Sequence, residues 1–246
     1  MSMQRGSHPK KLAYILPNMF TAASIFVGIF SMVSAIKGDY ELAAWLVVLA
    51  LIFDALDGRV ARLTNTCSRF GVEFDSLADI VSFGVAPALL IYMYIGHDFG
   101  RIGIVVSAMY VVLGAIRLAR FNVTTSQIEP SVFIGVPIPT AAVFISVLVL
   151  LFEDYASMHE YKYFILIAAV LISLLMVSNI RYPSFKKLDL QSLHFMRLFV
   201  TLLIVASVIV VYPKEGFALI FILYIVYGPI QALLHLSRRY KLFKKR

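Results

Sequence analysis

Four aspartates stand close together in the sequence with a spacing that could hold divalent cations. Asp54 and Asp57 are three residues apart, and Asp75 and Asp79 are four apart. Residues three or four apart share one face of an α-helix, so each pair directs two carboxylates the same way. Carboxylate oxygens without His or Cys favour Mg²⁺ or Mn²⁺ over zinc or copper. Two such ions would suit four carboxylates and a phosphoryl-transfer reaction.

A purely structural role has to be weighed against this metal site. A single aspartate near a helix end often only reaches interfacial water. Four carboxylates on facing helices repel one another, however, and they need positive charge between them. Arg62 lies in the same stretch but supplies only one such charge. The cluster therefore favours a metal site.

Small residues accompany the acidic ones. Gly58 and Ala61 fall on the same helical face as Asp54, together with Arg62 and Asn65. Because this face carries little bulk, a nucleotide can approach the helix closely. Arg62 can neutralise part of the charge of a pyrophosphate. The pattern leaves room for a phosphate-bearing ligand beside the acids.

The elements that must position these residues are long apolar segments. The chain has 246 residues, 61% of them hydrophobic and 15% charged, and its mean hydropathy is +0.87. A soluble domain of this size carries more polar surface, and about 20 apolar residues can span a bilayer. The sequence therefore predicts an all-α, polytopic transmembrane bundle of about eight membrane helices, at residues 13–36, 40–63, 73–96, 102–120, 135–152, 162–179, 197–212 and 217–236.

Short connections constrain how these segments are arranged. The second and third are joined by a short loop, so they are expected to be antiparallel neighbours with all four aspartates at one end. Pro87 and Pro229 are expected to kink their helices. The lone cysteine, Cys67, excludes an internal disulfide. No second domain is visible, and residues 1–246 are predicted to form a single integral membrane domain.

The distribution of basic residues predicts an orientation. With both termini on one side, 18 of the 22 Lys and Arg residues fall there, and only Lys37, Arg101, Lys162 and Lys214 fall on the other side. Basic residues gather on the cytoplasmic loops of membrane proteins. Both termini and the candidate active site are thus expected to face the cytoplasm, in a prokaryotic inner membrane. The net charge of +8 is then explained by anionic membrane lipids, and no nucleic-acid partner is expected.

The run Asp54-x-x-Asp57-Gly58-x-x-Ala61-Arg62-x₈-Gly71-x₃-Asp75-x₃-Asp79 resembles the signature of the CDP-alcohol phosphotransferase family. All eight fixed positions are present. The resemblance implies that the four aspartates ligate the metals and that Asp79 is the general base. It implies a CDP-diacylglycerol site and, because family members are often homodimers, a homodimer. The residues expected at the CDP-diacylglycerol site are Asn18, Thr21, Gly58, Ala61, Arg62 and Ser68.

A second group of polar residues ends the fourth segment. Arg117 and Arg120 share a helical face, with Asn122 close by, and a guanidinium pairs well with a carboxylate or phosphate. Anchoring at the cytoplasmic surface would produce the same pattern. The functional interpretation is an acceptor-binding site. The run R-L-A-R-F-N at 117–122, with V-S-F-G-V-A-P at 81–87 and G-V-P-I-P at 135–139, resembles the phosphatidylserine synthase branch, which implies L-serine as the acceptor.

Two other functions stay open at this point. A sister enzyme would use glycerol 3-phosphate or an inositol phosphate, and these acceptors should require a more basic pocket than Arg117 and Arg120 provide. A divalent-cation transporter also needs intramembrane carboxylates. Transporters usually place them near the membrane midplane, whereas these aspartates lie toward one face, and Arg62 would repel the cation.

Overall fold

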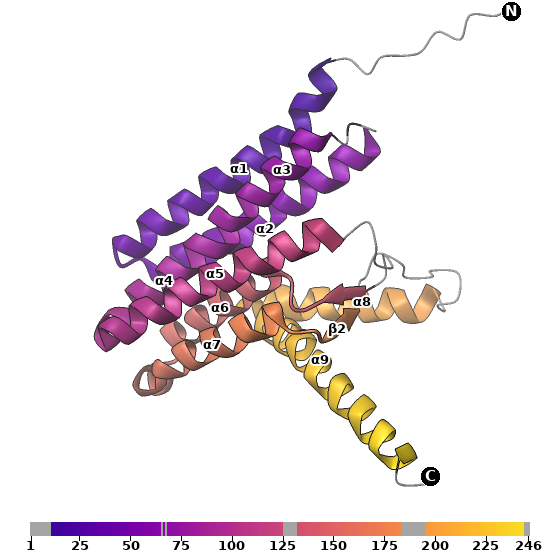
Figure 1. The fold of residues 1–246 in the computed structure, drawn as a ribbon. Helices are drawn as coiled ribbons and strands as arrows, with labels where there is room; N and C mark the ends of the chain where they lie inside the picture. Colours follow the sequence, from indigo (N-terminus) through magenta and orange to yellow (C-terminus); the bar gives the residue numbers. More distant parts are fainter. Residues whose placement is uncertain (1–10, 65, 67, 125–131, 184–194, 244–246) are drawn as a thin grey trace, which may run out of the picture.

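The computed structural model describes residues 11–64, 66, 68–124, 132–183 and 195–243, and it is 89% helical (Figure 1). Asn65 and Cys67, for which the sequence made predictions, lie outside these residues. The helices are α1 (Lys11–Ile36), α2 (Tyr40–Leu63), α3 (Arg69–Asp79), η1 (Ile80–Val85), α4 (Ala86–Tyr94), η2 (Gly96–Phe99), α5 (Arg101–Thr124), α6 (Ile138–Asp154), η3 (Ala156–Tyr161), α7 (Tyr163–Val177), α8 (Phe195–Val211) and α9 (Pro213–Phe243).

Helices occupy all eight segments that the sequence predicted. Among the described residues, four stretches are long and apolar enough to cross a membrane: Ile15–Ile36, Arg69–Tyr94, Arg101–Thr124 and Pro213–Ala232. Four apolar helices fit a membrane protein. The eight crossings and the cytoplasmic termini stay predictions.

Capping residues define where the helices that carry the aspartates begin. Gly38 adopts a left-handed conformation with φ of 82° and ends the turn after α1. The side chain of Asp39 then accepts a hydrogen bond from the backbone N–H of Leu42, which caps α2. Ser68 caps α3 in the same way, because its Oγ accepts from Gly71 N at 3.0 Å. Each cap satisfies a backbone donor that the first helical turn leaves free.

A continuous helical rod runs from α3 through η1 to α4. It starts at Arg69, four residues before the predicted segment, because Ser68 supplies the cap. Its middle part, η1, is a π-helix in which Ala86 N donates to Val81 O, five residues earlier. Such a turn contains one more residue than an α-helical turn, and π-turns are frequent at functional sites.

The interior of the bundle uses small side chains at the helix contacts. α1 packs along α2, α2 along α6, and α5 along α7. Ala43, Ala44 and Ala50 of α2 are fully buried, and the Ser31 hydroxyl of α1 donates to Ala43 O at 2.7 Å. Small residues and interhelical hydrogen bonds let helices approach closely where the solvent is lipid.

Two short strands were not predicted from the sequence. β1 (Val132–Ile134) and β2 (Arg181–Pro183) pair antiparallel, with Phe133 opposite Tyr182. The fifth segment was predicted to start at residue 135, but α6 starts at Ile138. Gly135 has φ of 73°, and a side chain there would overlap the carbonyl oxygen of Met176. The residues just before α6 are therefore extended and pack against the end of α7.

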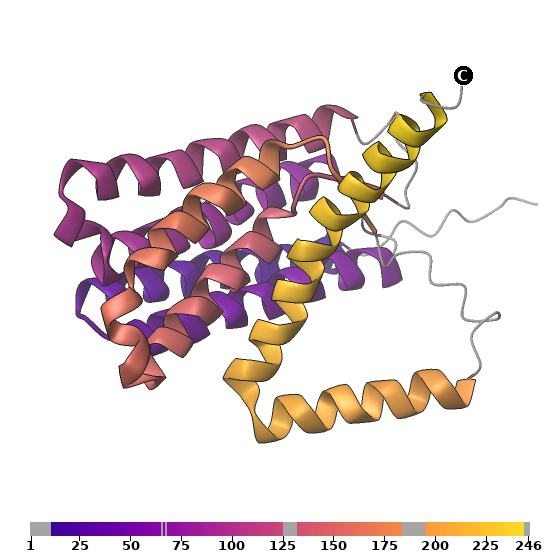
Figure 2. The ribbon, with the colours of Figure 1, turned by 90° about the horizontal axis from the view of Figure 1, so that it is seen from below.

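The two C-terminal helices lie beside the rest of the bundle. In Figure 2, α8 lies apart from the helices of the N-terminal half, and α9 crosses the bundle. α9 packs on α6, where Ala218 joins a buried cluster with Val48, Val143 and Val147. α8 contacts α9, and most of its described side chains are exposed.

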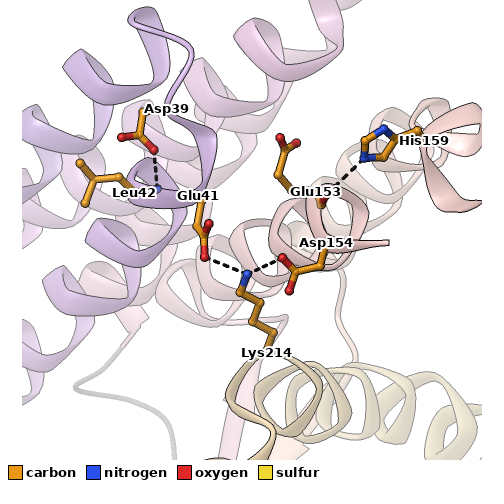
Figure 3. A network of polar contacts seen from close by, with 7 residues as sticks. All are labelled: Asp39, Glu41, Leu42, Glu153, Asp154, His159 and Lys214. Carbon is orange, nitrogen blue, oxygen red and sulfur yellow. Dashed lines mark hydrogen bonds and ion pairs between the residues drawn. The ribbon is translucent and has the colours of Figure 1, made fainter. Parts of the chain in front are cut away.

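An ionic network fastens α9 at the end of the bundle where α2 begins (Figure 3). Lys214 Nζ lies 2.8 Å from Glu41 Oε1 and 2.6 Å from Asp154 Oδ1. Tyr155 Oη donates to Glu215 Oε1 at 2.7 Å. The first turn of α9 is thereby joined to α2 and to the end of α6.

Candidate metal and nucleotide site

Three of the four aspartates converge at the other end of α2. One carboxylate oxygen from each of Asp54, Asp57 and Asp75 lies within 4.8 Å of the other two, and we call these residues the aspartate triad. They meet because α2 and α3 are joined by only a few residues. Asp79 is one helical turn beyond Asp75. It is buried and interacts electrostatically with Asp54 and Asp75, but it is not a member of the triad.

A threonine of α1 orients one member of the triad. Thr21 Oγ1 donates to Asp57 Oδ2 at 2.8 Å, and it also lies 3.3 Å from the carbonyl oxygen of Pro17. Thr21 is only 3% exposed and Asp57 only 6%. The sequence placed Thr21 at the nucleotide-lipid site, and the structure additionally gives it a bond to a predicted metal ligand.

These carboxylates form no ion pair among the described residues. Within the described part of the chain, no Lys or Arg nitrogen lies within 4.0 Å of a carboxylate oxygen of the triad or of Asp79. Asp75 Oδ1 and Asp79 Oδ1 are buried and have no hydrogen-bond partner. Buried, unpaired carboxylates are costly. Hard oxygen donors that converge without a direct ion pair fit a divalent cation such as Mg²⁺ or Mn²⁺.

A cavity of about 190 Å³ opens beside the triad. Its walls come from α1, α2, α3 and the loop between α2 and α3. All six residues expected at the nucleotide site line it: Asn18, Thr21, Gly58, Ala61, Arg62 and Ser68. Asp57 and Asp75 line it too. The predicted nucleotide residues and two predicted metal ligands thus share one space.

The loop between α2 and α3 adds a residue that the sequence analysis missed. Thr66 lines the cavity and is buried. Its backbone N–H donates to Ala61 O at 3.0 Å, and its hydroxyl lies 2.6 Å from that of Thr64. The hydroxyl-rich loop was an available signal. Pro17 and Val72 also line the cavity without having been predicted.

The three residues predicted at the acceptor site do not converge. Arg120 donates from Nη1 to Val177 O and from Nη2 to Ser178 O, each at 3.0 Å, with longer bonds to Ile134 O and Met176 O. Most of these are carbonyls at the end of α7, which the helix leaves without donors. Arg120 therefore holds α7 against α5.

Asn122 is engaged elsewhere. Its side-chain Nδ2 donates to Ser76 Oγ at 2.9 Å on an exposed part of the surface. Ser76 in turn donates to Val72 O within α3. Asn122 thus connects the end of α5 to the helix that carries Asp75 and Asp79.

Arg117 is the predicted acceptor residue that lies near the aspartates. It is 5% exposed, its Nε has no hydrogen-bond partner, and its guanidinium lies over the Phe121 ring at 5.2 Å. Arg117 and Asp79 interact electrostatically. A buried guanidinium with an unpaired donor can bind an anionic group of a ligand.

The chain is similar to known proteins over most of its length. Residues 14–227 match the CDP-alcohol phosphatidyltransferase family. A CDP-diacylglycerol–serine O-phosphatidyltransferase of Helicobacter pylori is 51% identical over 219 residues, which cover 89% of this chain and 91% of that protein. An archaetidylserine synthase of Methanothermobacter thermautotrophicus is 42% identical over 170 residues, 68% of this chain and 69% of its own length. A CDP-diacylglycerol–serine O-phosphatidyltransferase of Bacillus subtilis is 33% identical over 172 residues, 70% of this chain and 92% of its own.

Proposed function

Because this chain belongs to the CDP-alcohol phosphatidyltransferase family, we propose that it transfers the phosphatidyl group of CDP-diacylglycerol to L-serine, forming phosphatidylserine and CMP. The names of its relatives support serine as the acceptor. One observation in the molecule carries the proposal. The aspartate triad lies, without a basic partner among the described residues, at a cavity lined by the residues expected to bind the nucleotide.

Different residues around the cavity would bind different parts of CDP-diacylglycerol. The triad and Asp79 would hold two Mg²⁺ or Mn²⁺ ions, which when bound would neutralise the charge of the pyrophosphate. Arg62 adds a further positive charge from the cavity wall. Gly58 and Ala61 leave room for the nucleotide, and Asn18 and Ser68 offer hydrogen bonds.

The transfer itself requires a base for the acceptor hydroxyl. The serine oxygen attacks the phosphorus of the phosphatidyl group, the bond between that phosphorus and the CMP oxygen breaks, and CMP leaves. Asp79 accepts the hydroxyl proton. Its buried, unpartnered Oδ1 and its position beside the triad support this role.

We assign the serine carboxylate to Arg117. Its buried guanidinium has an unpaired donor and lies close enough to Asp79 to interact with it. Arg117 could therefore bind the carboxylate of serine while Asp79 lies near its hydroxyl. Arg120 and Asn122 act by positioning α7 and α3. With Arg120 bound to backbone carbonyls, the site favours an acceptor with one carboxylate over glycerol 3-phosphate or an inositol phosphate.

We further propose a single integral membrane domain, residues 1–246, that works as a homodimer. Both termini and the aspartate end would face the cytoplasm from a prokaryotic inner membrane. The four basic residues assigned to the other side support this orientation, because they all lie in the turns or first helical residues at the opposite end: Lys37, Arg101, Lys162 and Lys214. The exposed Tyr155, Tyr161, Tyr163 and Tyr212 at that end suit a membrane interface.

An acceptor assay tests the proposal. Purified protein in detergent micelles is incubated with CDP-diacylglycerol, Mn²⁺ or Mg²⁺, and labelled serine, glycerol 3-phosphate or an inositol phosphate in separate reactions. We expect CMP and labelled lipid with serine, and neither after removal of the metal with EDTA. Product with glycerol 3-phosphate and not with serine would change the acceptor. Metal flux into proteoliposomes without CMP formation would indicate a transporter instead.

A further inference from the structure

In two places in this protein, a buried tyrosine hydroxyl donates to a helical carbonyl that lies four residues before a proline. Proline at position i cannot donate to the carbonyl at i−4, which loses its helical partner. Pro87 lies four residues after Phe83, and Tyr110 Oη of α5 donates to the Phe83 carbonyl oxygen at 3.3 Å. Pro229 of α9 leaves Ile225 O, and Tyr182 Oη of β2 donates to it at 3.2 Å. Neighbouring elements commonly satisfy backbone groups that a proline frees inside a membrane.

The two places differ in what lies next to them. Around Pro229, α9 continues as an α-helix. Before Pro87, the rod contains the π-turn of η1, and this turn follows Asp79 directly. Phe83, whose carbonyl accepts from Tyr110, lies inside the π-turn. Tyr110 and Phe83 are both fully buried.

The π-turn is also held from its other side, by α1. Ser82 Oγ donates to Ser24 O at 2.9 Å, and the two serine hydroxyls are 3.3 Å apart. A side chain at Gly28 would come within 2.9 Å of Ser82 Oγ, so α1 passes very close to the turn. The segment after Asp79 is therefore held between α1 and Tyr110.

We propose that Tyr110 is a positioning residue for Asp79. Its hydroxyl holds the Phe83 carbonyl and thereby stabilises the π-turn that sets where Asp79 stands relative to the triad and Arg117. Tyr110 does not touch the reacting groups and acts only through the backbone of η1. The inference rests on the proposed function, in which Asp79 is the base.

The two tyrosines provide a matched test. Tyr110→Phe and Tyr182→Phe each remove one buried hydroxyl that bonds a helical carbonyl four residues before a proline. We expect Tyr110→Phe to lower kcat by about tenfold or more, with each KM within about twofold, because small displacements of a catalytic group are costly. Tyr182→Phe should leave kcat within about twofold of wild type. Thermal unfolding of both variants shows whether their losses of stability are similar. Equal losses of kcat in the two variants, or none in Tyr110→Phe, would overturn the proposal.

A second-site variant separates positioning from general damage to the fold. Pro87→Ala supplies a backbone N–H four residues after Phe83, and we expect it to bond the Phe83 carbonyl. In the Pro87→Ala background, Tyr110→Phe should therefore reduce kcat by less than about threefold, because the two changes act on one carbonyl. The same reduction in both backgrounds would contradict the proposal. If wild type itself forms no CMP with serine, the proposed function fails. An active wild type with a normal Tyr110→Phe variant refutes only the role of Tyr110.

Discussion

The two ends of the helix bundle hold acidic side chains under opposite electrostatic conditions. At the end drawn in Figure 3, Glu41 and Asp154 share Lys214, a cation that the chain itself supplies. At the other end, the aspartate triad converges with no Lys or Arg partner among the described residues. This difference indicates that the acidic residues at the two ends have different roles. One group fastens helices together, and the other could hold a metal ion.

Burial sharpens this contrast. The side chains of Glu41 and Asp154 are 53% and 42% exposed, and exposed ion pairs contribute only about 0.2–1 kcal/mol each. Asp57 and Asp79 are buried and form no ion pair among the described residues, and burying a charge without an ion-pair partner is unfavourable. We call the end of the bundle with the triad the aspartate end and the end with the Lys214 ion pairs the Lys214 end. Substitutions at the aspartate end should therefore change function, whereas substitutions at the Lys214 end should change stability slightly.

The largest effect is expected from Asp79→Asn. A general base contributes about 10²–10⁴-fold to the rate, so turnover should fall by that factor. Asn has nearly the same shape, so the protein should still fold and retain part of its affinity for metal or nucleotide. CMP release at saturating serine measures the loss, and size-exclusion chromatography checks the fold. Turnover near the wild-type rate would show that Asp79 is not the base.

The second-largest effect is expected from Ala61→Lys, which should weaken nucleotide binding in the cavity and not act on the chemical step. A long side chain would fill space beside Arg62 and block the nucleotide, so affinity for CDP should fall by about tenfold or more. Leu63→Lys is a matched control, because Leu63 is 82% exposed and does not line the cavity. Isothermal titration with CDP compares the two. Unchanged affinity in Ala61→Lys would mean that the nucleotide binds elsewhere.

A smaller effect is expected from a substitution at Thr21 of α1, the helix that packs along α2. Thr21→Val removes the hydrogen bond to Asp57 Oδ2, and a hydrogen bond to a charged group contributes about 1.5–3 kcal/mol. Only part of this energy enters the metal affinity, because the bond also forms without the ion, so Mn²⁺ affinity should weaken by up to about tenfold. Ser31→Ala, which removes a buried hydroxyl bond of the same helix to Ala43 O, should leave it unchanged. Equal Mn²⁺ affinities in both variants would remove Thr21 from the metal site.

The smallest effect is expected at the Lys214 end. Lys214→Met removes two ion pairs with exposed partners, so the free energy of unfolding should fall by about 0.4–2 kcal/mol. Thermal unfolding in micelles at low and high salt measures this, and the difference should shrink at high salt. Turnover should stay unchanged. A loss of turnover like that of Asp79→Asn would mean that the two ends are not functionally separate.

Much of the site could be predicted from the sequence because it is formed by residues that lie close together along the chain. The predicted segment 40–63 has the same bounds as α2, because Gly38 and Asp39 mark its start and apolar residues fill it. The short loop after it makes α3 an antiparallel neighbour. The approach of Asp54, Asp57 and Asp75 then follows from spacing alone.

The features that escaped prediction depend on distant contacts. The shared face of Arg117 and Arg120 suggested a joint acceptor site, but the end of α7, which lies far along the chain, binds Arg120. The π-turn likewise makes its hydrogen bonds with distant residues, Tyr110 of α5 and Ser24 of α1. Neither partner can be identified from the residues 80–85 themselves.

The most direct measurement is Mn²⁺ binding, followed through the loss of the free-ion signal in electron paramagnetic resonance. Wild type is compared with Asp57→Asn/Asp75→Asn at the aspartate end and with Glu41→Gln/Asp154→Asn at the Lys214 end. If the triad receives the cation, wild type and the Glu41/Asp154 variant bind Mn²⁺ alike, and the Asp57/Asp75 variant loses that binding. Equal binding by all three proteins, or none by wild type, would contradict the metal site.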